Sequence, residues 1–189
     1  MEATLKISEL MRPVDQFPRV SDQSYFYEVM QALEKANEEF LAGKIKQRIL
    51  LVEDQSGSVV GKISPKDMVR GLEPQYDKID SFKDDIRYGL PQIVESMKRD
   101  YMLWQEPLSD LCGKAGEIKA ERLISKPGPL HSVKLTDRMD TAFHLFVTTG
   151  HDSLFVMEEE NITGLLRFSD VYTAICKVVQ ACGLKPPQA

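Results

Sequence analysis

An internal repeat is the feature that most constrains how this chain folds. Gly61 and Gly164 lie 103 residues apart, and Asp67 and Asp170 are separated by the same distance. Each glycine follows an apolar segment and a turn, and a run with helical spacing comes after it. Because two unlike residue types share one offset, the sequence indicates two copies of one structural unit.

The segments around the two glycines predict the same local structure. Residues 52–64 favour two strands joined by a tight turn, since apolar β-forming residues flank Gln55-Ser56-Gly57. Residues 154–166 repeat this pattern around a polar turn. Helices are expected directly afterwards, over 65–72 in the first copy and 168–175 in the second.

The start of each copy also matches. Val20 and Val133 each lead into a segment with apolar residues at the three- and four-residue spacing of a buried helical face. These residues are Phe26, Val29, Met30 and Leu33 in the first copy, and Met139, Ala142, Phe143 and Phe146 in the second. Each copy is therefore predicted to run strand, helix, strand, strand, helix. The fold class is α+β.

This order and these residues resemble the cystathionine-β-synthase (CBS) domain, a family that normally occurs as a tandem pair. The resemblance covers about residues 5–72 and 121–179. Leu5 to Met11 looks like the short lead-in helix of the family. The resemblance implies two β-α-β-β-α repeats packed as a pseudo-symmetric pair.

One motif carries most of the resemblance. The family pattern is Gly-h-x-Ser/Thr-x-x-Asp-h, where h is apolar, and residues 61–68 fit it. Residues 164–171 keep the glycine and the aspartate but have Arg167 where a hydroxyl residue is usual. The second copy therefore departs from the family at the position equivalent to Ser64.

The resemblance and the repeat together predict the domain bounds. We expect a first CBS repeat over residues 1–76, a helical insert over 77–119, a second repeat over 120–182 and a C-terminal tail over 183–189.

Ligand sensing is the function that the resemblance implies. CBS pairs bind adenosine-containing ligands such as AMP, ADP, ATP or S-adenosylmethionine in the cleft between their copies. In the family, the motif aspartate accepts hydrogen bonds from the ribose hydroxyls, and the hydroxyl residue three positions earlier helps to hold phosphate. Carried over, this assigns ribose to Asp67 and Asp170 and phosphate to Ser64. No cofactor is required.

The chemistry of these residues is compatible with that assignment. An ionised carboxylate can accept hydrogen bonds from both hydroxyls of a ribose. Ser64 is expected at a strand-to-helix junction, where unpaired N–H groups favour an anion, and Lys66 adds a cation. Arg167 has a guanidinium that can hold phosphate oxygens in a bidentate fork.

Helix capping explains some of the same residues without a ligand. Ser64-Pro65-Lys66-Asp67 has the composition of a helix start, with serine at the N-cap, proline at the first position and an acidic residue at the third. Asp170 can likewise serve the start of its own helix, together with Ser169. At the level of sequence both interpretations stay open.

The segment between the copies has a helical pattern of its own. Apolar residues recur at steps of three and four from Ile79 to Trp104, and Pro91 predicts a kink or two successive helices. One interpretation is that this insert covers the module or its dimer mate. The other is that it docks a regulated partner when the ligand changes.

Charge and composition disfavour several classes of partner. The net charge of −5 gives no general attraction to nucleic acid or to an anionic membrane. The longest apolar runs are too short to span a bilayer, and the first residues lack the layout of a signal peptide. The three cysteines do not suggest a disulfide framework, so we expect a cytoplasmic protein.

No catalytic constellation is visible, and an enzyme is not expected. His131, His144 and His151 do not form a metal motif with the cysteines, and no phosphate-binding glycine loop is present. We predict a regulatory module that senses an adenine nucleotide, forms a homodimer and acts on an unidentified protein. The alternative is a structural or protein-interaction module with degenerate clefts that acts through its helical insert.

Overall fold

The computed structural model describes residues 5–73 and 111–182. Packing divides the chain into two compact units. The repeat-one unit contains residues 18–58 and 62–125. The repeat-two unit contains the N-terminal residues up to Phe17, residues 59–61 and the residues from Lys126 onward. The bounds of these two units are set by how the chain packs. The repeat bounds predicted from the sequence stay a prediction.

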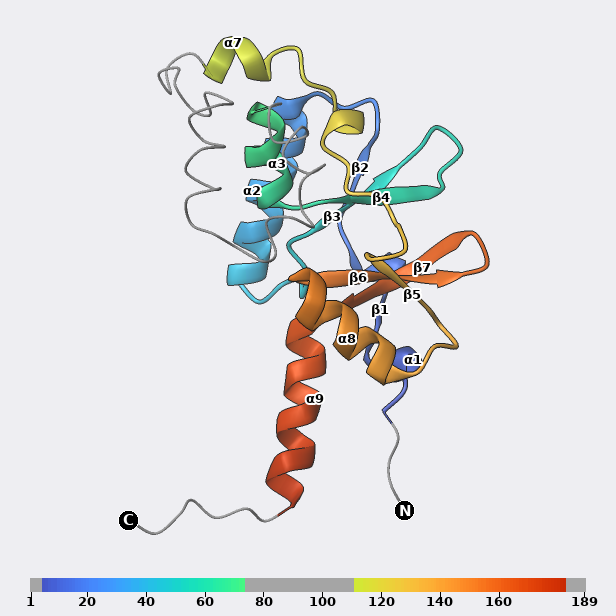
Figure 1. The fold of residues 1–189 in the computed structure, drawn as a ribbon. Coiled ribbons are helices and arrows are strands. Elements are labelled where there is room, and N and C mark those ends of the chain that lie inside the picture. The colour runs from blue at the N-terminus through green and yellow to red at the C-terminus, as the bar shows by residue number, and fades with distance from the viewer. Residues whose placement is uncertain (1–4, 74–110, 183–189) are drawn as a thin grey trace, which may run out of the picture. The chain divides into compact units, whose positions relative to one another are not determined.

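The first repeat has the predicted order of elements (Figure 1). These are β2 (Arg19–Ser21), α2 (Phe26–Leu41), β3 (Leu50–Glu53), β4 (Val59–Ile63) and α3 (Pro65–Leu72). The strands form one sheet in the order β2-β3-β4, with β2 parallel to β3. Further along the chain follow α7 (Leu111–Ala115) and the short 3-10 helix η3 (Ala120–Arg122).

The second repeat has the same order. Its elements are β5 (Ser132–Lys134), α8 (Met139–Thr149), β6 (Ser153–Glu158), β7 (Asn161–Arg167) and α9 (Phe168–Ala181). The N-terminal segment contributes α1 (Ile7–Leu10), β1 (Arg12–Pro13) and the 3-10 helix η1 (Val14–Gln16). The sheet has the order β1-β7-β6-β5, and β5 is parallel to β6 whereas β6 and β7 are antiparallel. The α+β class and the repeated unit are thus confirmed.

The predicted apolar faces of α2 and α8 are the faces that pack. The buried residues are Phe26, Val29, Leu33 and Ala36 on α2, and Met139, Ala142, Leu145 and Phe146 on α8. Met30 and Phe143 are only partly buried, because each lies at the edge of its apolar face. The helical spacing in the sequence therefore located both helices correctly.

The strands form the deepest part of the core. Residues 50–52 of β3, 154–156 of β6 and 165–166 of β7 are completely buried. Successive side chains of a strand point to opposite faces, so consecutive buried residues mean that both faces of these strands are covered. This explains why their sequences are continuous apolar runs.

The hairpin between β3 and β4 has the predicted turn. The Asp54 carboxylate accepts hydrogen bonds from the backbone N–H groups of Ser56 and Ser58 at 2.8 and 2.9 Å. Gly57 has a φ of 81°, a conformation that glycine adopts without strain.

The lead-in segment of the first repeat pairs with the sheet of the second repeat. β1 is antiparallel to β7, with Arg12 opposite Leu165 and Pro13 opposite Gly164. A Cβ atom on Gly164 would overlap the carbonyl oxygen of Arg12, so this close approach requires glycine.

The lead-in segment of the second repeat makes the reciprocal pairing. Ser125 forms an antiparallel bridge with Lys62 of β4, in which each N–H donates to the carbonyl of the other residue at 3.0 and 2.9 Å. Each repeat thus receives a short strand or bridge from the segment that precedes the other repeat.

Part of the prediction for the insert and the tail lies outside the described residues. This applies to the apolar stripe from Ile79 to Trp104, the kink at Pro91 and the tail from residue 183. The predicted lead-in helix is confirmed as α1.

Candidate functional site

The junction between β4 and α3 positions the motif residues of the first repeat. Ser64 is the N-cap of α3, and Pro65 occupies the first helical position. Ser64 and Asp67 form a reciprocal capping box, in which the Ser64 backbone N–H donates to Asp67 Oδ2 at 2.8 Å. The Ser64 hydroxyl also donates to Asp67 Oδ2, at 2.6 Å. The predicted capping role of these two residues is confirmed.

A third residue, Ser125, completes this group. The bridge between Lys62 and Ser125 brings the Ser125 side chain to the start of α3, where its hydroxyl donates to Asp67 Oδ1 at 2.9 Å. Asp67 is partly buried, and its donors among the described residues are neutral hydroxyl and amide groups. We call Ser64, Asp67 and Ser125 the serine cluster.

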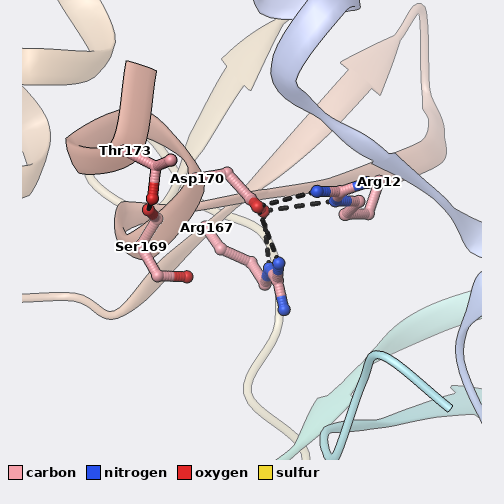
Figure 2. Close-up of polar contacts among 5 residues, drawn as sticks. All are labelled: Arg12, Arg167, Ser169, Asp170 and Thr173. Atoms are coloured by element: carbon pink, nitrogen blue, oxygen red, sulfur yellow. Dashed lines mark hydrogen bonds and ion pairs between the residues drawn. The ribbon is translucent and has the colours of Figure 1, made fainter. Parts of the chain in front are cut away.

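The junction between β7 and α9 holds the motif residues of the second repeat. Asp170 accepts two hydrogen bonds from Arg167, from Nε at 2.6 Å and from Nη2 at 2.7 Å. Arg12 makes the same bidentate contact from β1, with Nη2 at 2.8 Å and Nε at 3.3 Å. Figure 2 shows both guanidinium groups directed at the one carboxylate. We call Arg12, Arg167 and Asp170 the arginine cluster.

The two clusters occupy equivalent positions in the repeat. Arg167 follows Ser64 by the 103-residue offset of the motif, and Ser125 follows Arg12 by the 113-residue offset of the segments upstream. The backbone agrees, because Arg12 pairs with Leu165 as Ser125 pairs with Lys62. The motif aspartate of each repeat thus contacts the residue three positions before it and one residue of a lead-in segment.

The electrostatics of the two clusters differ. Burial alone would raise the pKa of the Asp170 carboxyl, but the hydrogen bonds and charges of Arg167 and Arg12 outweigh it and lower the pKa from 3.8 to about 2. The side chain of Asp170 is 13% exposed, whereas those of Arg167 and Arg12 are 21% and 34% exposed. The arginine cluster is therefore a charged, partly buried group, and the serine cluster has one charge among neutral donors.

The structure also places Lys66 and bears on the capping role predicted for Asp170. Lys66 is exposed on the first turn of α3. The capping interpretation of Asp170 is not supported, because its carboxylate accepts from guanidinium groups and Arg167 occupies the N-cap of α9 without a side-chain cap. The Thr173 hydroxyl donates a hydrogen bond to the Ser169 carbonyl oxygen at 2.8 Å. Figure 2 draws this contact beside the arginine cluster.

Sequence reasoning missed Ser125 and Arg12. Both lie outside the linear motif and reach the aspartates only through backbone pairing with the other repeat. The two offsets contain the missing signal, since they align Arg12 with Ser125 just as they align Arg167 with Ser64.

Within residues 5–73 and 111–182, no group of three or more His, Cys, Asp or Glu residues is arranged to hold a metal ion. In the same ranges, no helix has both the length and the apolar character needed to cross a bilayer.

The two β-α-β-β-α units, each with a Gly–Asp motif at a strand-to-helix junction, have the fold of a tandem pair of CBS domains. A model of the CBS domain family matches residues 120–177. The matched residues lie in the second repeat, and the first repeat has the same order of helices and strands. A comparison with curated protein sequences finds no match.

Solved structures share this fold over most of the chain. A CBS domain-containing protein of unknown function from Bacillus anthracis str. Ames Ancestor has a TM-score of 0.59 and 14% identity, over 92% of this chain and 94% of that one. CbpB in complex with c-di-AMP has a TM-score of 0.55 and 12% identity, over 95% and 90%. CBSX2 in complex with AMP has a TM-score of 0.52 and 15% identity, over 92% and 98%.

Proposed function

We propose that this chain is a regulatory module that binds an adenosine-containing nucleotide through Ser64, Lys66 and Asp67. The observation on which the proposal depends is the serine cluster. In this cluster the Asp67 carboxylate lies among neutral hydrogen-bond donors at the start of α3, next to the exposed Lys66. A ribose needs such an acceptor, and a phosphate favours such a helix start.

The geometry suggests how a nucleoside is accommodated. Hydroxyl groups both donate and accept, so the Ser64 and Ser125 hydroxyls can turn and let ribose hydroxyls donate to Asp67. The phosphate is then held by the backbone N–H of Lys66 and by the Lys66 ammonium, because Pro65 has no N–H and the Asp67 N–H donates to Ser64. No ion pair among the described residues has to be broken at Asp67 for this exchange.

The related folds support an adenine ligand. CBSX2 was solved with AMP and CbpB with c-di-AMP. ADP, ATP and S-adenosylmethionine are candidates from the family resemblance alone. The sequence also predicts Arg167 and Asp170 as phosphate and ribose contacts of the second repeat, but the proposed site does not include them.

Regulation follows from differential binding. A ligand shifts a conformational equilibrium only by the difference in its affinity for the two states. We propose that occupancy changes the packing of the module or of a homodimer, and that an unidentified protein in the cytoplasm responds to it. Exposed apolar residues on α9, among them Tyr172, Ile175 and Val178, favour an association surface of this kind.

A protein-interaction module with degenerate clefts is the second candidate. The arginine cluster favours it, because Asp170 already has partners for both of its oxygens. On this alternative the insert predicted over residues 77–119 is the functional element.

Thermal unfolding with a ligand panel separates the two candidates. The panel is AMP, ADP, ATP, c-di-AMP and S-adenosylmethionine, each followed by calorimetric titration. A ligand at one hundred times its dissociation constant stabilises the folded state by about 2.7 kcal/mol, so a shift of several degrees in Tm is expected. Asp67→Asn should remove the shift, and Asp152→Asn, which changes an exposed carboxylate elsewhere, should keep it. No shift with any ligand would reject the proposal and favour the interaction module.

A further inference from the structure

We infer that the two repeats are chemically unequal: Asp67 is the ribose acceptor of this chain, with Ser125 as an additional contact, whereas the arginine cluster keeps ribose away from Asp170. This inference rests on the proposed function. It adds the number of nucleosides that one chain binds and the residues that set that number.

The two motif aspartates differ in how many of their hydrogen-bond acceptor positions are occupied. A carboxylate offers about four hydrogen-bond acceptor positions on its two oxygens. Each oxygen of Asp170 accepts one N–H from Arg12 and one from Arg167, so the four contacts use all of these positions. Asp67 accepts two donors on Oδ2 and one on Oδ1 among the described residues.

The existing contacts of Asp170 are also stronger than those of Asp67. Hydrogen bonds between a guanidinium and a carboxylate are charge-assisted and about twice as strong as those of neutral donors. A ribose hydroxyl would have to displace a guanidinium from Asp170 and would leave a partly buried arginine without its carboxylate. At Asp67 it replaces only a hydroxyl that is able to rotate.

Asp170 has a structural role that explains its contacts with the two arginines. Arg12 belongs to β1, the strand that the N-terminal segment adds to the repeat-two sheet. Its ion pair with Asp170 fixes that segment at the same point at which Arg12 pairs with Leu165. Asp170 is thus a positioning residue for the lead-in segment.

The repeat itself supplies a transplant experiment. Ser64, Ser125 and Lys66 correspond to Arg167, Arg12 and Ser169 at the two repeat offsets. The triple variant R12S/R167S/S169K therefore gives the second repeat the residues of the first. The reverse double variant, S64R/S125R, gives the first repeat the guanidinium groups of the second.

Calorimetric titration with AMP, and separately with ADP and ATP, measures how many molecules each variant binds. We expect one molecule per chain for the wild type, two for R12S/R167S/S169K and none for S64R/S125R. Far-UV circular dichroism and thermal unfolding check that each variant is folded. Two molecules per wild-type chain, or one per chain in a folded R12S/R167S/S169K variant, would overturn the inference.

A pair of single substitutions gives an independent readout. Asp67→Asn should reduce affinity for AMP by at least about a hundredfold, the equivalent of about 2.7 kcal/mol, whereas Asp170→Asn should leave it within about twofold. Loss of binding in a folded Asp170→Asn variant overturns the inference and leaves the proposed function standing. A wild-type chain that binds none of the five ligands of the thermal-unfolding panel rejects both.

Discussion

Arg12 and Ser125 occupy equivalent places before the two repeats, and each directs its side chain at the motif aspartate of the repeat with which it pairs. The Ser125 hydroxyl donates to Asp67 at 2.9 Å, and the Arg12 guanidinium forms an ion pair with Asp170 at 2.8 Å. The backbone geometry is repeated, but the chemistry is not. One equivalent pair of positions therefore gives the aspartate a neutral, exchangeable donor in one repeat and a charged, fixed donor in the other.

The charged cluster predicts a specific loss of stability in acid. The folded pKa of Asp170 is about 2, below its ordinary 3.8, so its ion pairs stabilise the fold above pH 4. This stabilisation is lost as the pH falls from about 4 to about 2 and amounts to at most about 2 kcal/mol, because solvent screens the partly exposed arginines. Urea unfolding of the wild type and of Asp170→Asn between pH 7 and pH 2 measures it.

The variant should be less stable than the wild type at pH 7, and the two curves should converge near pH 2. Asp152→Asn, which changes an exposed carboxylate, should follow the wild type throughout. A constant difference between Asp170→Asn and the wild type over the whole range would contradict the assigned ion pairs.

The serine cluster predicts separate effects on stability and on binding. Ser64→Ala removes the N-cap of α3 and should cost about 1 kcal/mol of unfolding free energy. Ser125→Ala removes one hydrogen bond to Asp67 and should cost about 0.5–1.5 kcal/mol. Because both hydroxyls contact one carboxylate, the double variant should deviate from the sum of the single effects, as a double-mutant cycle by denaturant unfolding would show.

Binding distinguishes these residues from a purely structural cluster. Each single variant should also weaken AMP binding about tenfold, the equivalent of about 1.4 kcal/mol. Ser132→Ala is the control, because the Ser132 hydroxyl donates to a backbone carbonyl in the other unit. Unchanged affinity in both Ser64→Ala and Ser125→Ala would assign the cluster to helix capping alone.

Much of the fold could be predicted from the sequence because its signals are local. The spacing of Val29 and Leu33 marks a helix face, Gln55-Ser56-Gly57 marks a turn, and Ser64-Pro65 marks a helix start. Each of these depends on the intrinsic preferences of a few neighbouring residues. The structure confirms all three, and α9 runs six residues beyond the predicted helix end at Ile175.

The candidate site was predicted only in its linear part. Ser64 and Asp67 are three residues apart, so a motif can find them. Ser125 is 58 residues from Asp67, and Arg12 is 158 residues from Asp170. Their contacts depend on which edge strand each lead-in segment joins, and that choice is a tertiary property without a local sequence signal.

The buried strands predict where a single substitution does most damage. Leu166 is completely buried on β7 and belongs to the apolar cluster with Val133, Leu154 and Val171. Leu166→Ala should cost about 2–5 kcal/mol, because it removes buried methyl groups and leaves a cavity. Leu41→Ala is the matched control, since Leu41 is 74% exposed and should change stability by less than about 0.5 kcal/mol. Equal effects in thermal unfolding would contradict the core described here.

β1 approaches β7 so closely at Gly164 that a side chain at this position is expected to destabilise the protein. A methyl group at position 164 would overlap the carbonyl oxygen of Arg12, and the backbone on either side has to move to accept it. Gly164→Ala should therefore cost about 1–3 kcal/mol of stability and displace β1, so that the Arg12–Asp170 ion pair weakens as well. Gly128→Ala is the control, because a Cβ atom there meets nothing within 4 Å.

Hydrogen exchange resolves the two effects. In Gly164→Ala the backbone N–H groups of Arg12 and Leu165 should exchange faster, whereas those of the β5–β6 pair should lose protection only by the change in global stability. The acid-dependent part of the stability should shrink in parallel, since it depends on the same ion pair. If Gly164→Ala keeps the full pH dependence of the wild type, then Asp170 is held at its low pKa by Arg167 alone, and the lead-in segment is positioned by its backbone pairing without help from the charge.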